Sequence, residues 1–183
     1  ECCRAAARND IVATDQRSEL LDIARRALAT RPADRHATVR EFQQAIRDHE
    51  AHLESLRLAS LARQDLERAR SSRKYDDFAR AVYGFGNAIE LWSGNREAVE
   101  GLDTARLEYA TVALRGQNFE LGLGQLEPRN SRHAPLVEEL KGEIVRRDTR
   151  QKRERQLKRL IVLGTACAFL VVLYFFLDAR ENA

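Results

Sequence analysis

The chain has 183 residues, of which 32% are charged and 44% hydrophobic, yet its formal net charge at pH 7 is only +3. Three prolines, nine glycines and three cysteines leave little signal for β-sheet, for a disulfide framework or for a cysteine metal site. The composition therefore predicts an all-α protein without a metal, in which any basic character is local.

The first predicted helix is followed by a turn and a second, well-capped helix. Apolar residues lie at helical spacing on one face of the first: Leu20, Leu21, Ala24, Ala27 and Leu28. Pro32 ends this helix, because proline disfavours helical geometry in the residue before it. Thr38 and Glu41 form a capping box, in which Thr38 accepts from the amide of Glu41 and the Glu41 side chain reaches back.

These two helices carry a family resemblance. Residues 20–46, LLDIARRALATRPADRHATVREFQQAI, resemble the end of the C-terminal lobe of eukaryotic-like serine/threonine protein kinases, with an Ala-Leu helix, a Pro-x-x-Arg turn and a capped Glu-Phe helix. In that family the arginine of the turn pairs with the glutamate of an Ala-Pro-Glu motif, and Arg35 stands at the matching position. The alternative interpretation is an unrelated helix-turn-helix with a good cap.

The resemblance implies that a parent kinase uses ATP and magnesium and that the rest of its lobe lies upstream. The chain itself has no Gly-rich loop, Val-Ala-Ile-Lys strand, His-Arg-Asp loop, Asp-Phe-Gly or Ala-Pro-Glu. We therefore expect no catalytic residue and no cofactor in this fragment, which should be inactive.

Helical spacing continues to residue 145, with breaks at residues 71–72, 93–95 and 115–116. Asn95 is expected to cap a helix, and Trp92 and Tyr109 to lie in the apolar seam between helices. Residues 107–128, LEYATVALRGQNFELGLGQLEP, resemble part of a tetratricopeptide repeat. An earlier copy near Tyr75 is offset by about 44 residues, where that family has 34. A helical spacer and a repeat that binds protein partners both stay open.

The end of the chain joins a basic segment to an apolar one. Eight cations are opposed by only two carboxylates between residues 146 and 159: Arg146, Arg147, Arg150, Lys152, Arg153, Arg155, Lys158 and Arg159. They are expected to face anionic lipid headgroups, with the N-terminal body cytoplasmic. No aromatic residues are interleaved with them, so nucleic acid is not an expected partner. Residues 160–177, LIVLGTACAFLVVLYFFL, carry no charge and predict a single transmembrane helix, with a buried core helix as the alternative.

The predicted organisation has six parts. They are a poorly defined N-terminal segment (1–17), kinase C-lobe terminal helices (18–50), a tetratricopeptide-like juxtamembrane region (51–145), a basic connector (146–159), a transmembrane helix (160–177) and a short extracytoplasmic tail (178–183). Adjacent Cys2 and Cys3 are interpreted as incidental, and the absence of methionine predicts a piece of a longer product.

The predicted function is that of a membrane-proximal C-terminal kinase fragment that serves as regulatory linker and membrane anchor. The alternative is a non-enzymatic, membrane-anchored helical-repeat adaptor that docks protein partners. The residues upstream of Glu1 would distinguish the two.

Overall fold

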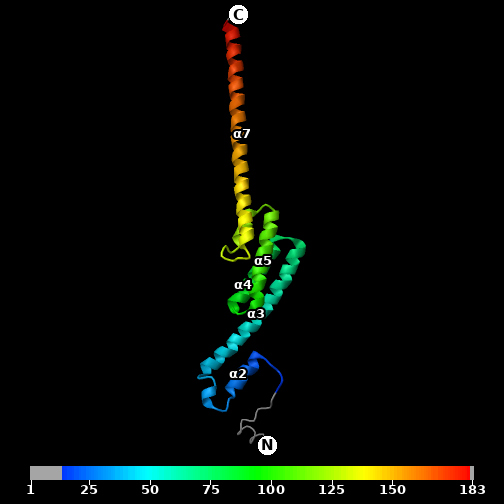
Figure 1. Cartoon of the computed structure of the whole chain (residues 1–183), viewed down its shortest axis with the longest axis vertical. Helices are drawn as coiled ribbons and strands as arrows, with labels where there is room; N and C mark the ends of the chain where they lie inside the picture. Colours follow the sequence, from blue (N-terminus) through cyan, green and yellow to red (C-terminus); the bar gives the residue numbers. More distant parts are fainter. Residues whose placement is uncertain (1–13, 182–183) are drawn as a thin grey trace. The chain divides into compact units, whose positions relative to one another are not determined.

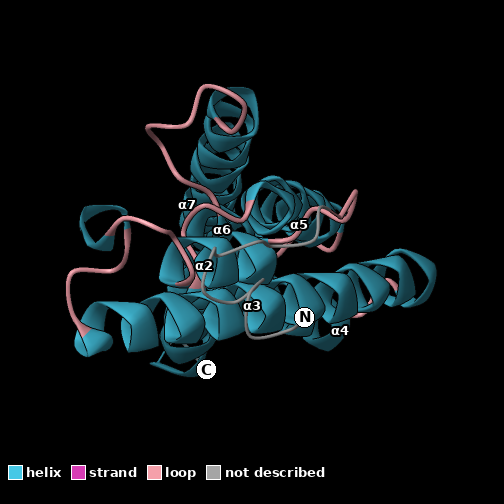
Figure 2. Ribbon diagram, turned by 90° about the horizontal axis from the view of Figure 1, so that it is seen from below, coloured by secondary structure: helices cyan, strands magenta, loops and turns pink. Residues whose placement is uncertain are grey.

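A computed structural model describes residues 14–181, apart from the side chains of Val162 and of residues 166–181. Every regular element in this part of the chain is helical, which confirms the predicted all-α class (Figure 2). The chain divides into two compact units, Glu1–Glu108 and Tyr109–Ala183, and the boundary falls within helix α5. The predictions for Cys2 and Cys3 lie outside the described residues.

The first unit begins with a short helix packed on a long one. Helix α2 (Glu19–Ala27) starts at Ser18, whose Oγ accepts a hydrogen bond from the Leu21 amide at 3.2 Å. The short 3₁₀ helix η1 (Pro32–Asp34) turns the chain, and α3 (Val39–Ser72) follows. Helix α2 contacts α3, and α3 runs without interruption through residue 50, where the sequence analysis places a domain boundary.

Helices α3 and α4 (Tyr75–Leu91) form an antiparallel hairpin and lie side by side in Figure 1. The buried residues of α3 alternate at spacings of four and three along one stripe: Ser55, Ala59, Ala62, Leu66 and Ala69. Those of α4 include Phe78, Ala81, Phe85 and Ala88. Small residues bring the helices close, since a Cβ on Gly84 would lie 2.9 Å from the Cβ of Ala62. Two phenylalanines and an alanine-lined seam therefore supply this core.

The turn between α3 and α4 uses an unusual backbone conformation. Arg73 caps α3 with φ of 55°, in the left-handed region, and its amide donates to the Ala69 carbonyl at 2.8 Å. Asp77, in the first turn of α4, is buried and accepts hydrogen bonds from Ser72 Oγ and Arg80. Helix α3 therefore ends at Ser72, within the predicted range 71–72, and side-chain contacts close the turn that follows.

Helix α5 (Arg96–Arg115) is joined to the hairpin by a buried polar contact. Asn95 Oδ1 accepts from the Ala98 amide at 3.1 Å, which confirms Asn95 as the helix cap. Asn95 Nδ2 donates to Ser55 Oγ at 2.9 Å, and Ser55 Oγ donates to the Ala88 carbonyl at 2.6 Å. This chain of hydrogen bonds links α3, the end of α4 and the start of α5.

The second unit contains the end of α5, the short helix α6 (Phe119–Gln125) and the long helix α7 (Ala134–Glu181). Its core includes Phe119, Val137 and Leu140. A Cβ on Gly122 would lie 3.2 Å from the Ala110 carbonyl oxygen and 3.2 Å from Leu140 Cδ2. A glycine at this position therefore allows α6 to lie directly against its neighbours.

The transmembrane prediction for residues 160–177 is corrected by this structure. Among the residues that the structure describes, no helix has both the length and the apolar character needed to cross a membrane. The described part of α7 includes the eight cations of residues 146–159. After them come the apolar side chains of Leu160, Ile161 and Leu163, and then Gly164 and Thr165. The single-pass transmembrane assignment is therefore withdrawn. Side chains 166–177, on which most of it depends, lie outside the described residues.

Candidate functional site

The kinase-like residues meet at the junction of α2, η1 and α3. Thr38 Oγ1 accepts from the Glu41 amide at 3.1 Å, and Glu41 Oε2 accepts from the amide of Ala37 at 2.7 Å. Glu41 Oε1 also accepts from Arg26 at 2.7 Å. The Glu41 carboxylate thus accepts a hydrogen bond from a backbone amide at the start of α3 and, at the same time, pairs with an arginine in the last turn of α2.

Arg35 lies in the turn itself and is exposed. Its Nε donates to the Ala29 carbonyl at 2.7 Å, so the side chain is held against its own turn. The side chain borders a hollow of about 200 Å³ that Ala27, Val39 and Phe42 also line. This places Arg35 beside an apolar depression.

Helix α2, the residue after it and the start of α3 carry exposed apolar side chains. Leu20 is 49%, Leu28 55% and Val39 73% exposed. His36 also lines the hollow and is nearly buried, with its ring tilted against Phe42 at 5.4 Å between centroids and its Nε2 3.4 Å from the Ile23 carbonyl oxygen. We call the hollow and these exposed apolar side chains the α2–α3 surface.

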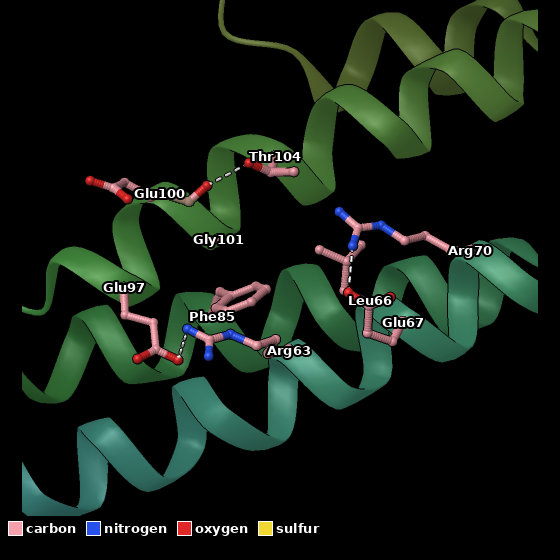
Figure 3. Close-up of a pocket in the computed structure, with 9 residues that line it drawn as sticks. All are labelled: Arg63, Leu66, Glu67, Arg70, Phe85, Glu97, Glu100, Gly101 and Thr104. Carbon is pink, nitrogen blue, oxygen red and sulfur yellow. Dashed lines mark hydrogen bonds and ion pairs between the residues drawn. The ribbon is translucent and has the colours of Figure 1, made fainter.

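A second recess of about 430 Å³ lies between α3 and α5, over α4. Figure 3 shows its nine lining residues: Arg63, Leu66, Glu67, Arg70, Phe85, Glu97, Glu100, Gly101 and Thr104. We call it the α3–α5 groove.

Ion pairs cross the α3–α5 groove. Arg63 lies 2.5 Å from Glu97, and Arg70 donates to both oxygens of Glu108 at 2.9 and 2.6 Å. The bidentate hydrogen bond that Arg70 donates to Glu108 is the main cause that raises the pKa of Arg70. Arg63 and Arg70 of α3 are therefore each paired with a glutamate of α5.

The floor of the groove depends on one glycine. A Cβ on Gly101 would lie 2.4 Å from the Phe85 ring, closer than such contacts allow. Phe85 is only 1% exposed, so its ring has little freedom to move aside. Gly101 could not be identified from the sequence, because its contact with Phe85 joins two helices.

The polar side chains of the groove also make bonds within single helices. The Thr104 hydroxyl donates to the Glu100 carbonyl at 2.9 Å, which is an ordinary bond within a helix. Among the described residues, no group of three or more His, Cys, Asp or Glu side chains is arranged to hold a metal ion.

The predicted basic cluster lies entirely on α7. Arg147 is the member that packs, because it pairs with Glu120 and its guanidinium carbon lies 5.7 Å from the Phe119 ring centroid. Pairing with Glu120 raises the pKa of Arg147 and lowers that of Glu120. Arg146 pairs with Glu143. The other six members are exposed: Arg150, Lys152, Arg153, Arg155, Lys158 and Arg159. Binding of lipid headgroups by this cluster stays a prediction.

The two aromatic residues expected in the helical seam differ in burial. Tyr109 is 6% exposed, whereas Trp92 is half-buried at the end of α4. Trp92 adopts the C-cap position of α4, which leaves part of its ring at the surface.

Comparison with protein-family models, with curated proteins and with solved structures finds no match to this chain.

Proposed function

We propose that this chain is a non-catalytic helical linker that docks, through its α2–α3 surface, on the remainder of a serine/threonine kinase C-lobe. The observation that supports this is the exposed Arg35 beside the hollow formed by Ala27, Val39 and Phe42. An apolar surface with a cation at its edge fits a partner that supplies an apolar face and a carboxylate.

The capping geometry agrees with this proposal. Glu41 holds Arg26 and the start of α3 together, so the α2–α3 angle is defined before a partner arrives. A pre-organised surface binds with less loss of conformational freedom than a mobile one. The long α3 would then connect the docked end to the α3–α4 hairpin without a flexible joint.

The DNA upstream of Glu1 tests the kinase assignment directly. We expect it to encode a His-Arg-Asp loop, an Asp-Phe-Gly and an Ala-Pro-Glu, in that order, in the same reading frame or across a frameshift. An upstream stop codon with no kinase motif in any frame would contradict the assignment.

Arg35 provides the biochemical test in the upstream-extended protein. Arg35→Ala should lower kinase activity and thermal stability together, because it leaves a buried carboxylate of the lobe without its cation. Arg31→Ala, in the same turn, is the matched control and should leave both unchanged. Equal effects of the two substitutions would argue against a role for Arg35 in the lobe.

The isolated 183-residue chain should not transfer phosphate. Incubation of the purified protein with radiolabelled ATP and magnesium is expected to give no autophosphorylation. Labelling that persists after repeated purification would overturn the linker proposal.

The α3–α5 groove supports a second candidate, an adaptor that docks a separate protein. Photo-crosslinking residues placed at Leu28 and at Thr104 distinguish the two candidates. If the chain is a linker, the Leu28 probe should capture kinase-lobe peptides, identified by mass spectrometry. If it is an adaptor, the Thr104 probe should capture a separate protein that is not part of the kinase.

A further inference from the structure

Glu19, the first residue of α2, lies between two histidines of α3. Its Oε2 is 3.1 Å from Nδ1 of His49 and 3.0 Å from Nδ1 of His52. The two histidines are three residues apart, so both project from one face of α3. The His52 ring also lies against the indole of Trp92, with 4.3 Å between centroids and an interplanar angle of 31°. This cluster joins α2, α3 and the end of α4 within the first unit.

The cluster is shielded but remains accessible to protons. The side chains of His49 and His52 are 13% and 25% exposed, and that of Glu19 is 44% exposed. The α4 contribution is the uncharged Trp92 indole. Elsewhere on α2, Arg26 pairs with Glu41, and the His36 ring, which also lies 3.8 Å from Glu41, contacts the Ile23 carbonyl oxygen.

Protonation changes this cluster in a defined direction. A carboxylate only accepts hydrogen bonds, so both Nδ1 atoms must carry hydrogen. A neutral histidine meets this requirement in one of its two tautomers, whereas a protonated one always does. Protonation also adds charge to two bonds that are already aligned and places a cation against the Trp92 ring.

We propose that Glu19, His49 and His52 form a proton-operated latch that holds α2 on α3 more tightly in mildly acidic than in alkaline solution. Ordinary histidines change charge between about pH 5 and 8, so the latch operates near physiological pH. This proposal does not rest on the kinase assignment, because all of its contacts lie within the first unit.

The acid limit of the latch follows from Glu19. Hydrogen bonds from His49 and then His52 lower the pKa of this carboxyl from its ordinary value of 4.5. A lowered pKa in the folded state gives stability that is present above the ordinary value and lost as the pH falls through the lowered one. The histidine charges disappear as the pH rises. Docking of α2 is therefore strongest between these two limits.

Trp92 reports the state of His52, since it is the single tryptophan of the chain. A protonated imidazole in contact with indole quenches its fluorescence, and a neutral one does so much less. We expect emission to fall on acidification. Glu19→Gln should move this step to lower pH, because the imidazolium loses its carboxylate.

Two histidine variants complete the fluorescence test. His52→Gln should abolish the step, and His49→Gln should retain it. A step that survives His52→Gln, or a midpoint that Glu19→Gln leaves unchanged, would overturn the latch.

Amide hydrogen exchange tests whether the cluster controls α2. After correction for the intrinsic effect of pH, α2 amides should exchange roughly fivefold more slowly at about pH 6 than at about pH 8. Amides of the α3–α4 hairpin serve as the internal control. Glu19→Gln should remove most of the pH dependence.

His36→Gln is the matched control, because His36 contacts α2 away from the cluster. It should leave the pH dependence of α2 exchange intact. If His36→Gln removes the dependence and Glu19→Gln does not, the latch assignment is wrong.

Discussion

At Gly101, the absence of a single methyl group determines how closely α5 approaches α4. Gly101→Ala would force the Phe85 ring to move in a packed core, at a cost of about 1–3 kcal/mol. Alanine is also more favourable than glycine in a helix by about 0.5–1 kcal/mol. The net loss in the free energy of unfolding should therefore be smaller than the cost of moving the ring. Urea denaturation followed by circular dichroism measures the difference.

Gly86→Ala is the matched control for this substitution. Gly86 lies on α4, and a Cβ there would meet nothing within 4 Å. The helix-propensity term should then act alone and raise stability by about 0.5–1 kcal/mol. Stabilisation by both substitutions would show that Phe85 adjusts freely.

Ser72 controls the acidity of a neighbouring carboxyl. Its hydroxyl donates to Asp77, and this bond is the main cause of the lowered pKa of Asp77, followed by the charge of Arg80. Ser72→Ala should therefore raise the pKa of Asp77 toward 3.8, as measured by NMR titration.

Ser71→Ala is the control, because Ser71 donates to the Glu67 carbonyl instead. The unaltered Asp77 contributes stability above its ordinary pKa and loses it as the pH falls through the lowered one. An equal pKa change in both variants would contradict the role of Ser72.

Between α3 and α4, the chain turns without a glycine. Arg73 has φ of 55°, a conformation that costs a side-chain-bearing residue about 1–2 kcal/mol relative to glycine. Replacing Arg73 with glycine removes this cost, but glycine also has greater conformational freedom in the unfolded chain, which offsets part of the stabilisation. Arg73→Gly should therefore raise the free energy of unfolding by about 0.5–1 kcal/mol, visible as a higher Tm.

Lys74 tests whether the Arg73 backbone conformation is responsible. It follows directly and has φ of −87°, an ordinary value for any residue. Lys74→Gly should give no increase in Tm. An increase of the same size as for Arg73→Gly would indicate an effect of removed charge.

Local sequence signals predicted the positions of the helices well. Contacts between residues that are distant in sequence could not be predicted from these signals. Thr38, the break at residues 71–72 and the cap at Asn95 could be recognised because capping chemistry is decided by a few adjacent residues. The hydrogen bond from Asn95 to Ser55 spans 40 residues and could not be recognised from the sequence. The helical period shows which face of a helix is buried, but not which other helix covers that face.

Among the sites too, those made by neighbouring residues could be predicted from the sequence, and those made by distant residues could not. Capping by Thr38 could be derived from spacing alone. The cluster of Glu19 with His49 and His52 could not, because it depends on how α2 lies against α3. The end of α5 shows a further limit, as Gln117 and not Gly116 takes positive φ there.

On the scale of the whole molecule, the predicted boundary at residue 50 lies within a continuous helix, and the compact units meet at residue 108. Limited trypsin digestion should therefore cut first in exposed loops, at Arg35, Arg129 and Arg132. Mass spectrometry of the early fragments identifies the sites. Early cleavage at Arg47 or Arg57 would show that α3 opens near its middle.

The composition of the α3 seam has a consequence for the newly synthesised chain. Leu66 is the one large apolar residue among the buried positions of α3, and Phe78 and Phe85 of α4 complete the core. An isolated helix whose inner stripe holds so few large apolar residues gains little stability from its own contacts. During translation α3 must therefore wait for α4, about 1–4 seconds at ordinary elongation rates. Its charged outer face keeps it soluble meanwhile, and its mostly alanine seam offers other nascent chains little to bind.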